Sequence, residues 1–229
     1  MKHYAVTDSK SEFLSFDFET NPSWRIFKIM SEFVDGFSFL SKFDKTVSFF
    51  GSSRFDEKNH HYHEAQELAR KLAKIGMTII TGGGSGIMEA ANRGAIEGKG
   101  KSVGLNIVLK NEQRINPYVK ESMEFDHFFT RKVMLSFASQ AYVFFPGGFG
   151  TLDEFFELVE LVYTKKIGKV PIILVGVDYW ESLSDWINQM VYKRHNAISE
   201  DGLKVYQLVQ NVDEAFKIIS QSIPISWEK

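Results

Sequence analysis

The sequence predicts a doubly wound, Rossmann-like α/β domain, in which a parallel sheet has helices on both faces, preceded by a helical extension. From residue 46 onward, short runs of apolar or β-branched residues alternate with amphipathic segments, as in a sheet buried on both faces. Two glycine-rich segments each follow such a run and open a helix. The first 45 residues differ, because they hold eight of the 21 phenylalanines and only one glycine.

Residues 1–45 are predicted to form the helical extension. Asn21 and Pro22 are a favourable helix start, with Asn as the cap and Pro in the first turn. Apolar residues then recur at helical spacing: Ile26, Met30, Phe33, Phe37 and Leu40. A stripe of this kind more often packs than binds a ligand, so we expect it to lie against the main body or a second subunit.

Residues 46–229 are predicted to form one domain. The predicted strands are 46–50, 77–81, 101–107, 141–145 and 170–175, with a weaker candidate at 123–129. The predicted helices are a segment from Ala65 that ends at Gly76, then 86–98, 131–139, 152–165, 181–194 and 212–222. Such alternation predicts βαβ units and a parallel sheet.

Composition excludes several functions. Lys plus Arg is 27 and Asp plus Glu is 29, so the formal charge of −2 gives no basic surface for nucleic acid or anionic lipid. Cysteine is absent, which excludes disulfides and thiolate chemistry and is typical of a reducing compartment. No apolar run approaches the roughly 18 residues of a membrane span or forms a signal core. We therefore expect a cytoplasmic protein without membrane or nucleic-acid partners.

The two glycine segments, 81–91 and 145–154, are the strongest functional signal. Both would lie at the carboxyl edge of the sheet, where open α/β folds bind ligands. Glycine lets the backbone approach an anion, and a helix amino terminus offers unpaired N–H groups. Together they predict a ligand with a phosphate and a polar ring. The alternative, that the glycines only form tight turns, explains one such loop more readily than two.

Neither loop has the dinucleotide fingerprint or a Walker A motif. Glu89 and Asp153 occupy the third glycine position of G-x-G-x-x-G. A Walker-like ending at residues 100–102 lacks its earlier glycine, which is Ala95, and leads into a strand. NAD and ATP chemistry are disfavoured, and we expect no cofactor.

Residues 146–154 read P-G-G-x-G-T-x-x-E, the motif of the LONELY GUY (LOG) family, whose members were long labelled lysine decarboxylases. Arg131-Lys132 resembles the R-K pair of that family, Gly51-Ser52-Ser53 resembles its G-S-S turn, and 82–95 its first glycine loop. The resemblance covers about residues 46–223. It implies hydrolysis of the N-glycosidic bond of a nucleoside 5′-monophosphate, AMP or N6-modified AMP, and a homodimer. Molybdenum-cofactor carriers look similar, so a non-catalytic nucleotide or cofactor carrier is the alternative.

The resemblance also suggests roles for individual residues. Glu154 would stabilise positive charge at C1′ and orient the attacking water, unless Thr151-x-x-Glu154 is only a capping box, with Thr151 as helix cap. Arg131 would hold phosphate or ribose oxygens, with help from Lys132, unless it is an ordinary solvated arginine. The remaining candidates are small loop residues. The predicted phosphate cradle and its facing wall are Gly147, Gly148, Gly150 and Thr151, with Ser52, and Gly83, Gly84 and Ser85.

Two further segments have structural readings. His60, His61 and His63 could bind a metal with Glu64, but without a second cluster we expect exposed polar side chains at a helix start and no metal. The helix after the P-G-G motif is apolar on nearly every side. We expect it to be buried all round, partly at a subunit interface.

Overall fold

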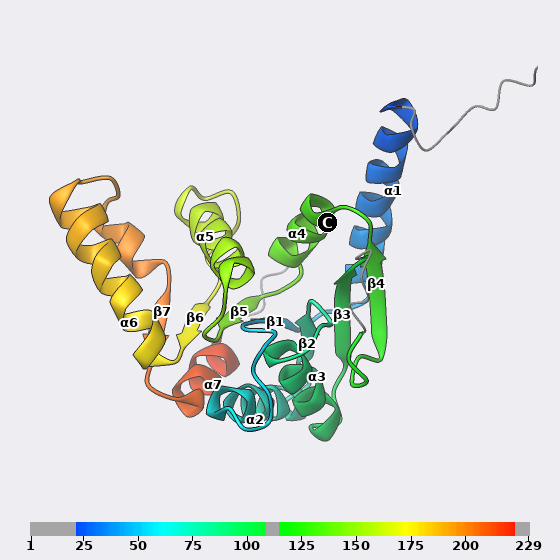
Figure 1. Ribbon diagram of the computed structural model, residues 1–229, viewed down its shortest axis with the longest axis horizontal. Helices are drawn as coiled ribbons and strands as arrows, with labels where there is room; N and C mark the ends of the chain where they lie inside the picture. Colours follow the sequence, from blue (N-terminus) through cyan, green and yellow to red (C-terminus); the bar gives the residue numbers. More distant parts are fainter. Residues whose placement is uncertain (1–21, 109–114, 223–229) are drawn as a thin grey trace, which may run out of the picture.

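The computed structural model describes residues 22–108 and 115–222. Its centre is a seven-stranded sheet with strand order β4-β3-β2-β1-β5-β6-β7, in which every pair is parallel (Figure 1). The strands are β1 (Thr46–Phe50), β2 (Thr78–Thr81), β3 (Ser102–Ile107), β4 (Glu121–Phe125), β5 (Ala141–Phe144), β6 (Ile172–Val175) and β7 (Gln207–Val209). The predicted doubly wound α/β fold is confirmed.

The strand order reverses between β1 and β5. The chain adds β2, β3 and β4 on one side of β1, and then returns to place β5 on its other side, with Phe50 beside Phe144. The loops after β1 and β5 therefore leave the same edge of the sheet and diverge. This switch point is where open α/β sheets form a ligand crevice.

Helices cover both faces of the sheet. Neighbouring strand residues point to opposite faces, so Val47 and Phe49 pack in one core cluster while Phe50 packs in the other. On one face lie α2 (His60–Lys74), α3 (Ile87–Glu97) and α7 (Val212–Gln221); on the other lie α1 (Pro22–Leu40), α4 (Phe128–Phe137), α5 (Phe149–Tyr163) and α6 (Val177–Trp186) (Figure 1). The result is a three-layer α/β/α domain.

The two edge strands differ from the predictions. The weaker candidate at 123–129 runs too far, because β4 ends at Phe125 and α4 begins at Phe128. Only Phe125 of β4 is buried. Because the other residues of this strand are not buried, its sequence has little of the apolar pattern that predicts a strand. β7 was not predicted at all, because it has three residues and only Val209 is buried. The five other predicted strands are confirmed to within two residues at each end.

Four helices begin earlier than predicted. α4 and α5 start three residues before 131 and 152, and α6 starts four before 181 and continues as a π-helical segment, Ile187–Arg194. Gly148 and Gly176 cap α5 and α6 without a capping side chain, so the usual sequence signal was missing. α2 begins at His60, with Asn59 as its cap.

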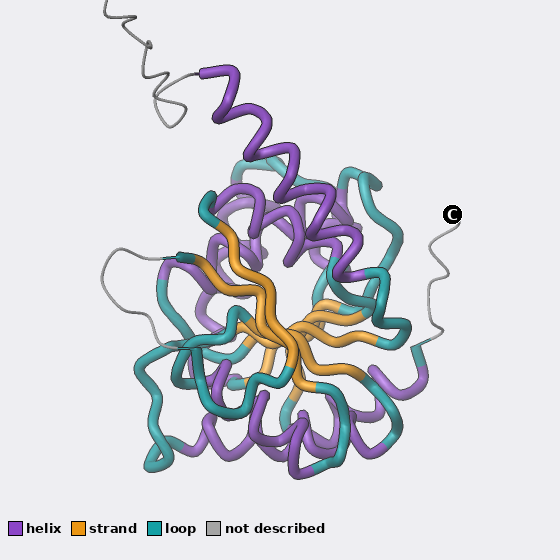
Figure 2. Tube along the Cα trace, turned by 90° about the vertical axis from the view of Figure 1, so that its right-hand side faces the viewer, coloured by secondary structure: helices purple, strands orange, loops and turns teal. Residues whose placement is uncertain are grey.

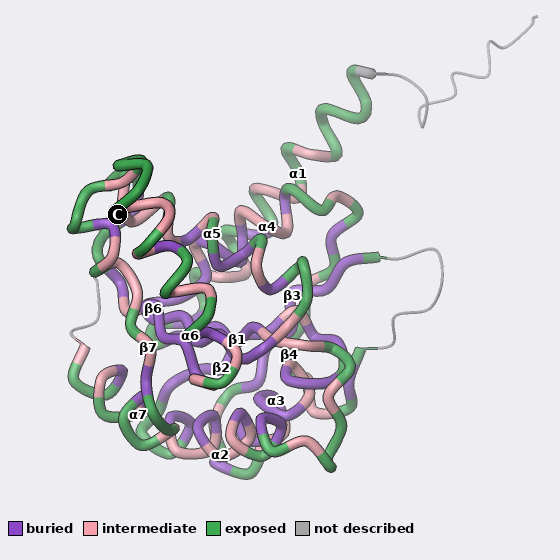
Figure 3. Tube along the Cα trace, turned by 60° about the vertical axis from the view of Figure 1, so that its left-hand side comes forward, coloured by how far each residue is buried: buried purple, intermediate pink, exposed green. Residues whose placement is uncertain are grey.

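The extension forms a helix, α1, as predicted; residues 1–21 lie outside the described part. Its first half projects beyond the body and is largely exposed (Figures 2 and 3). Of the predicted apolar face, Phe33 and Leu40 pack on the core, but Ile26, Met30 and Phe37 are exposed. Within residues 22–108 and 115–222, no helix has both the length and the apolar character needed to cross a bilayer.

The expectation that α5 is buried on all sides is wrong for the single chain. Phe155 and Leu158 are fully buried, but Phe156 on the same helix is 43% exposed. α5 lies on the sheet with one face in the core, and its other face is open.

Candidate active site

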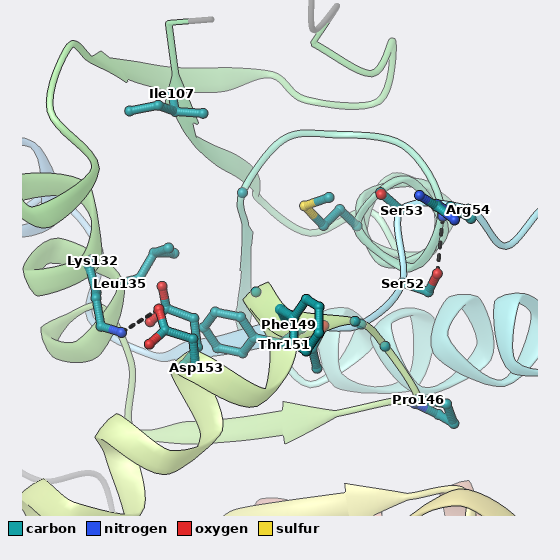
Figure 4. A pocket seen from close by; sticks show the side chains of 18 of the residues that line it. Ser52, Ser53, Arg54, Ile107, Lys132, Leu135, Pro146, Phe149, Thr151 and Asp153 are labelled. Atoms are coloured by element: carbon teal, nitrogen blue, oxygen red, sulfur yellow. Dashed lines mark hydrogen bonds and ion pairs between the residues drawn. The ribbon is translucent and has the colours of Figure 1, made fainter.

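A cavity of about 960 Å³ opens at the switch point between β1 and β5 (Figure 4). Its walls are the turn after β1, residues 51–55, the loop and helix start at 146–154, and the first two turns of α4. Phe50, Gly82, Met88, Ile107 and Tyr179 complete the lining. Of the predicted residues, the structure brings Glu154, Arg131, Lys132, Ser52, Thr151 and the three glycines of the P-G-G-x-G loop together here.

The P-G-G loop is fixed from behind. The Ser52 N–H donates to the Pro146 carbonyl at 2.9 Å, and the Tyr179 hydroxyl donates to the Gly147 carbonyl at 2.7 Å. A Cβ at Gly147 would lie 2.1 Å from Thr151 Oγ1, so packing requires glycine there. The loop is therefore rigid, and its position is set by the turn after β1 and by α6.

Gly148 and Gly150 have a different reason to be glycine. A Cβ at either position would have no atom within 4 Å, and neither has a positive φ. Nothing in the described structure requires glycine at these two positions. They leave the backbone at the start of α5 open to the cavity, beside helix N–H groups that have no intrahelical partner.

The sequence suggested that Thr151 caps α5, but the structure shows that it does not. Gly148 is the cap, the helix begins at Phe149, and the Thr151 N–H donates to the Gly148 carbonyl at 3.0 Å. Glu154 is consequently the sixth residue of α5 and not the third, as it would be if Thr151 were the cap. The capping-box reading of Glu154 is wrong, since its carboxylate is too far along the helix to reach the cap.

Glu154 is a buried carboxyl group that faces the cavity. It is 7% exposed, and its Oε2 has no hydrogen-bond partner in the described structure. Burial raises the pKa of Glu154 from 4.5 to about 7, because the ionised form loses hydration; Lys132 and Arg131 oppose this rise. A buried, unpartnered acid with a pKa near neutrality is typical of functional sites.

Arg131 lies on α4 and contributes a half-buried positive charge to the cavity. Its Nε has no hydrogen-bond partner among the described residues, and its guanidinium lies 5.5 Å from the centre of the Phe128 ring. Burial lowers the pKa of Arg131, and the nearby Glu154 carboxyl raises it. No ion pair joins Arg131 and Glu154 in the described chain. Both groups therefore keep hydrogen-bonding capacity for a ligand.

Lys132 lines the cavity but is already paired. Its Nζ lies 2.6 Å from an oxygen of Asp153 (Figure 4) and 2.8 Å from one of Glu157. These contacts join α4 to α5 across the rim of the site. Lys132 thus holds the two helices together and, by its charge, lowers the pKa of Glu154.

The first glycine loop does not form the predicted facing wall. Gly83, Gly84 and Ser85 are not among the residues that line the cavity. The Asn116 side chain donates to the carbonyls of Gly83 and Gly84 at 3.1 and 2.9 Å, and the Ser85 hydroxyl donates to the Ser53 carbonyl at 2.8 Å. Gly83, Gly84 and Ser85 therefore use these polar groups to hold the loop itself in place. Gly82 and Met88 line the cavity instead.

The apolar wall of the cavity and Tyr179 were not predicted from the sequence. Phe128 and Phe129 were placed outside α4, because the predicted helix began three residues too late. Tyr179 is far from the motifs in sequence and reaches Gly147 only because α6 starts beside the P-G-G loop. No local pattern marked either contribution.

His60, His61 and Glu64 are the described residues that could hold a metal, since one donor atom of each lies within 4.8 Å of the others. His61 is buried, contrary to prediction, whereas His60 is exposed. The His61 ring faces Glu64 through Nδ1 at 2.8 Å and Asp178 through Nε2 at 3.7 Å. Because both ring nitrogens face carboxylates, protein contacts alone account for this cluster.

The fold and the switch-point cavity define a Rossmann-like α/β protein with a ligand-sized crevice at the carboxyl edge of its sheet. Residues 88–219 match the family model described as "Possible lysine decarboxylase". The chain therefore belongs to this family, the lysine decarboxylase-like or LOG family, and the predicted resemblance is confirmed.

One relative and two solved structures illustrate the similarity. The "Probable cytokinin riboside 5'-monophosphate phosphoribohydrolase LOGL3" of Oryza sativa subsp. japonica is 28% identical over 201 residues, covering 82% of this chain and 92% of the relative. The X-ray structure of TM1055 is 25% identical with a TM-score of 0.58, covering 78% and 99% of the two chains. The molybdenum cofactor carrier protein MCP of Chlamydomonas reinhardtii, at 22% identity and a TM-score of 0.59 over 78% and 97%, shares the fold.

Proposed function

We propose that this chain hydrolyses the N-glycosidic bond of a nucleoside 5′-monophosphate, AMP or an N6-modified AMP, to the free base and ribose 5-phosphate. The observation that carries the proposal is Glu154. It is a buried, unpartnered carboxyl with a pKa of about 7, next to an open glycine backbone at a helix amino terminus. Relatives named as phosphoribohydrolases of nucleoside monophosphates support the substrate class.

The start of α5 is the phosphate site in this proposal. Open backbone at Gly148 and Gly150, with the positive end of the helix dipole, suits a dianionic monophosphate. Thr151 and Ser52 line the same end of the cavity and offer hydroxyl groups. Tyr179 keeps the loop in place through the Gly147 carbonyl.

The sugar then lies over Glu154. As the bond from C1′ to the base nitrogen breaks, its electron pair leaves with the base and C1′ gains oxocarbenium character. The ionised Glu154 stabilises that charge, and it accepts a proton from the water whose oxygen bonds to C1′. The departing base nitrogen takes up a proton from its surroundings. The buried position keeps the carboxylate free of competing protein partners.

Arg131 and the apolar wall complete the substrate site. The Arg131 guanidinium stays charged and can bind ribose hydroxyls or phosphate oxygens in a planar fork. Its charge also favours the ionised form of Glu154. Phe128, Phe129 and Met88 line the same cavity and provide apolar surface for a planar base.

Base release measures the proposed activity directly. Purified protein incubated with AMP should yield adenine and ribose 5-phosphate in equal amounts. Glu154→Gln should lose this release but still bind AMP by calorimetry. Glu160→Gln, which changes an exposed acid on the same helix, is the matched control and should retain activity.

The second candidate is a non-catalytic nucleotide or cofactor carrier. The shared fold of the Chlamydomonas carrier favours it. If the wild-type chain binds AMP but releases no base from AMP, GMP, CMP or an N6-modified AMP, the carrier function replaces the hydrolase.

We expect the chain to act as a homodimer, as the family resemblance implies. Large aromatic side chains that line the cavity are exposed, namely Phe128, Phe129 and Phe149. Clustered exposed aromatic residues are typical of subunit interfaces. Sedimentation as a monomer at micromolar concentration would contradict this expectation.

A further inference from the structure

The start of α4 presents the cavity-lining side chains Phe128, Phe129, Arg131 and Lys132. A helix start has backbone N–H groups without intrahelical partners, and the cap residue usually supplies an acceptor. The cap of α4 is His127, whose side chain makes no capping hydrogen bond. The position of this turn must therefore be fixed by something else.

Glu32 of α1 holds the residues around this helix start instead. Its Oε1 accepts from the Asp126 N–H at 2.9 Å and faces Nδ1 of His127 at 3.0 Å. Its Oε2 accepts from the Thr130 hydroxyl. The Glu32 side chain is only 12% exposed. A carboxylate at a helix amino terminus is also stabilised by the helix dipole, so one acid from the extension ties together the residues on both sides of the helix start.

Packing holds Glu32 in place along the rest of α4. A Cβ at Gly36 would lie 2.5 Å from Sδ of Met134, so α1 approaches α4 closely at this point. Further along, the rings of Phe37 and Phe137 are 6.3 Å apart. The contacts follow the same order along both helices. α1 is therefore a brace along α4, with Glu32 at the end nearest the cavity.

We propose that Glu32 is a positioning residue for the active site: it fixes the first turn of α4 and thereby the place of Arg131. This inference rests on the proposed function for its kinetic readout. Glu32 lies outside residues 88–219, which match the family model. It assigns a role to the extension that the family motifs do not contain.

Three variants of the full chain test the inference. Glu32→Ala removes the acceptor, Glu32→Gln keeps an acceptor oxygen without charge, and Asp35→Ala changes an exposed acid of the same helix that bonds Ser31. Loss of hydrogen bonds to a charged group should speed amide exchange at Arg131, which donates to the His127 carbonyl, by about tenfold or more. The KM for AMP should rise by a similar factor in Glu32→Ala, less in Glu32→Gln, and not in Asp35→Ala.

Two results would overturn the inference. One is exchange at residues 130–132 in Glu32→Ala that matches Asp35→Ala. The other is faster exchange with an unchanged KM for AMP, which would make the contact purely structural. If Glu32→Ala does not fold, Glu32→Gln is compared with Asp35→Ala in the same way.

The kinetic test can also be replaced if the proposed function itself fails. Should the wild type release no base, calorimetric affinity for ribose 5-phosphate takes the place of the KM. Affinity about tenfold weaker in Glu32→Ala than in Asp35→Ala supports the inference, and equal affinity overturns it.

Discussion

Glu154→Gln should stabilise this protein at pH 8 while abolishing base release. The pKa of Glu154 is raised from 4.5 to about 7, mainly because burial disfavours the charged form. An acid with a raised pKa in the folded state binds its proton more tightly there than in the unfolded chain. Its contribution to stability is therefore fully present below pH 4.5, is lost as the pH rises through 4.5 to 7, and stays lost above pH 7.

The magnitude follows from the two pKa values. Each factor of ten in proton affinity corresponds to about 1.4 kcal/mol, so ionised Glu154 destabilises the fold by about 3 kcal/mol at pH 8. Glutamine has nearly the same shape and no charge, and avoids this cost. For a chain of this size, about 3 kcal/mol corresponds to a rise in Tm of roughly 6–12 °C. At pH 5, where this group is still protonated in the folded chain and the unfolded chain is only about half a pH unit above its own pKa, the gain should shrink to about 1 kcal/mol or less.

Thermal unfolding of both proteins at pH 5 and pH 8 checks this prediction, with AMP hydrolysis followed in parallel. In the wild type, kcat should rise with pH through about 7 as Glu154 ionises. A Glu154→Gln variant that melts at or below the wild-type temperature at pH 8 would refute the reasoning. So would a stability gain of the same size at both pH values, because a pH-independent gain cannot come from the charge.

Four further substitutions probe the surroundings of Glu154. Gly150→Ala should leave the free energy of unfolding unchanged or raise it by up to about 1 kcal/mol, but should weaken AMP binding. Gly147→Ala should instead lower the Tm, because its Cβ would collide with Thr151. If the two variants change the Tm and the calorimetric affinity for AMP by the same amounts, the phosphate site is contradicted. Tyr179→Phe removes one hydrogen bond to the loop and should raise the KM for AMP about 2- to 10-fold, and an unchanged KM would show that the bond does not position the phosphate. Lys132→Met should raise the pKa of Glu154 further and move the acidic limb of the kcat profile to higher pH; an unmoved limb would rule out the charge effect.

The sequence predicted the layers of the fold because the central strands have a strong local pattern. β1 lies at residues 46–50 as expected, since all five of its residues are buried and apolar or β-branched except Ser48. β4 and β7 lie at the edges and need little burial, so their composition resembles that of loops. Helix starts at Gly148 and Gly176 were missed for a related reason, because glycine caps carry no side-chain signal.

The site was predictable where one short segment carries it, and not where tertiary packing assembles it. Glu154 and the P-G-G loop share nine consecutive residues, so the motif placed them together. The unpartnered state of Glu154 depends on α4 and α5 lying side by side. Tyr179 joins the site from a third element. Gly83 was predicted to line the site because it lies in a glycine-rich loop. In the structure its carbonyl instead accepts a hydrogen bond from Asn116 of another loop.

The cost of burying Glu154 bears on whether the chain is a hydrolase or a carrier. A carrier that holds a phosphate by backbone N–H groups does not need an ionised carboxyl nearby, and a like charge would weaken the binding of the anion. A hydrolase needs that charge next to the developing cation at C1′. Burial raises the pKa of Glu154 to about 7, and the charges of Lys132 and Arg131 oppose this rise and favour the ionised form. Burying an ionisable acid at the cavity costs stability, and this arrangement fits the proposed hydrolase better than a carrier that only holds its ligand.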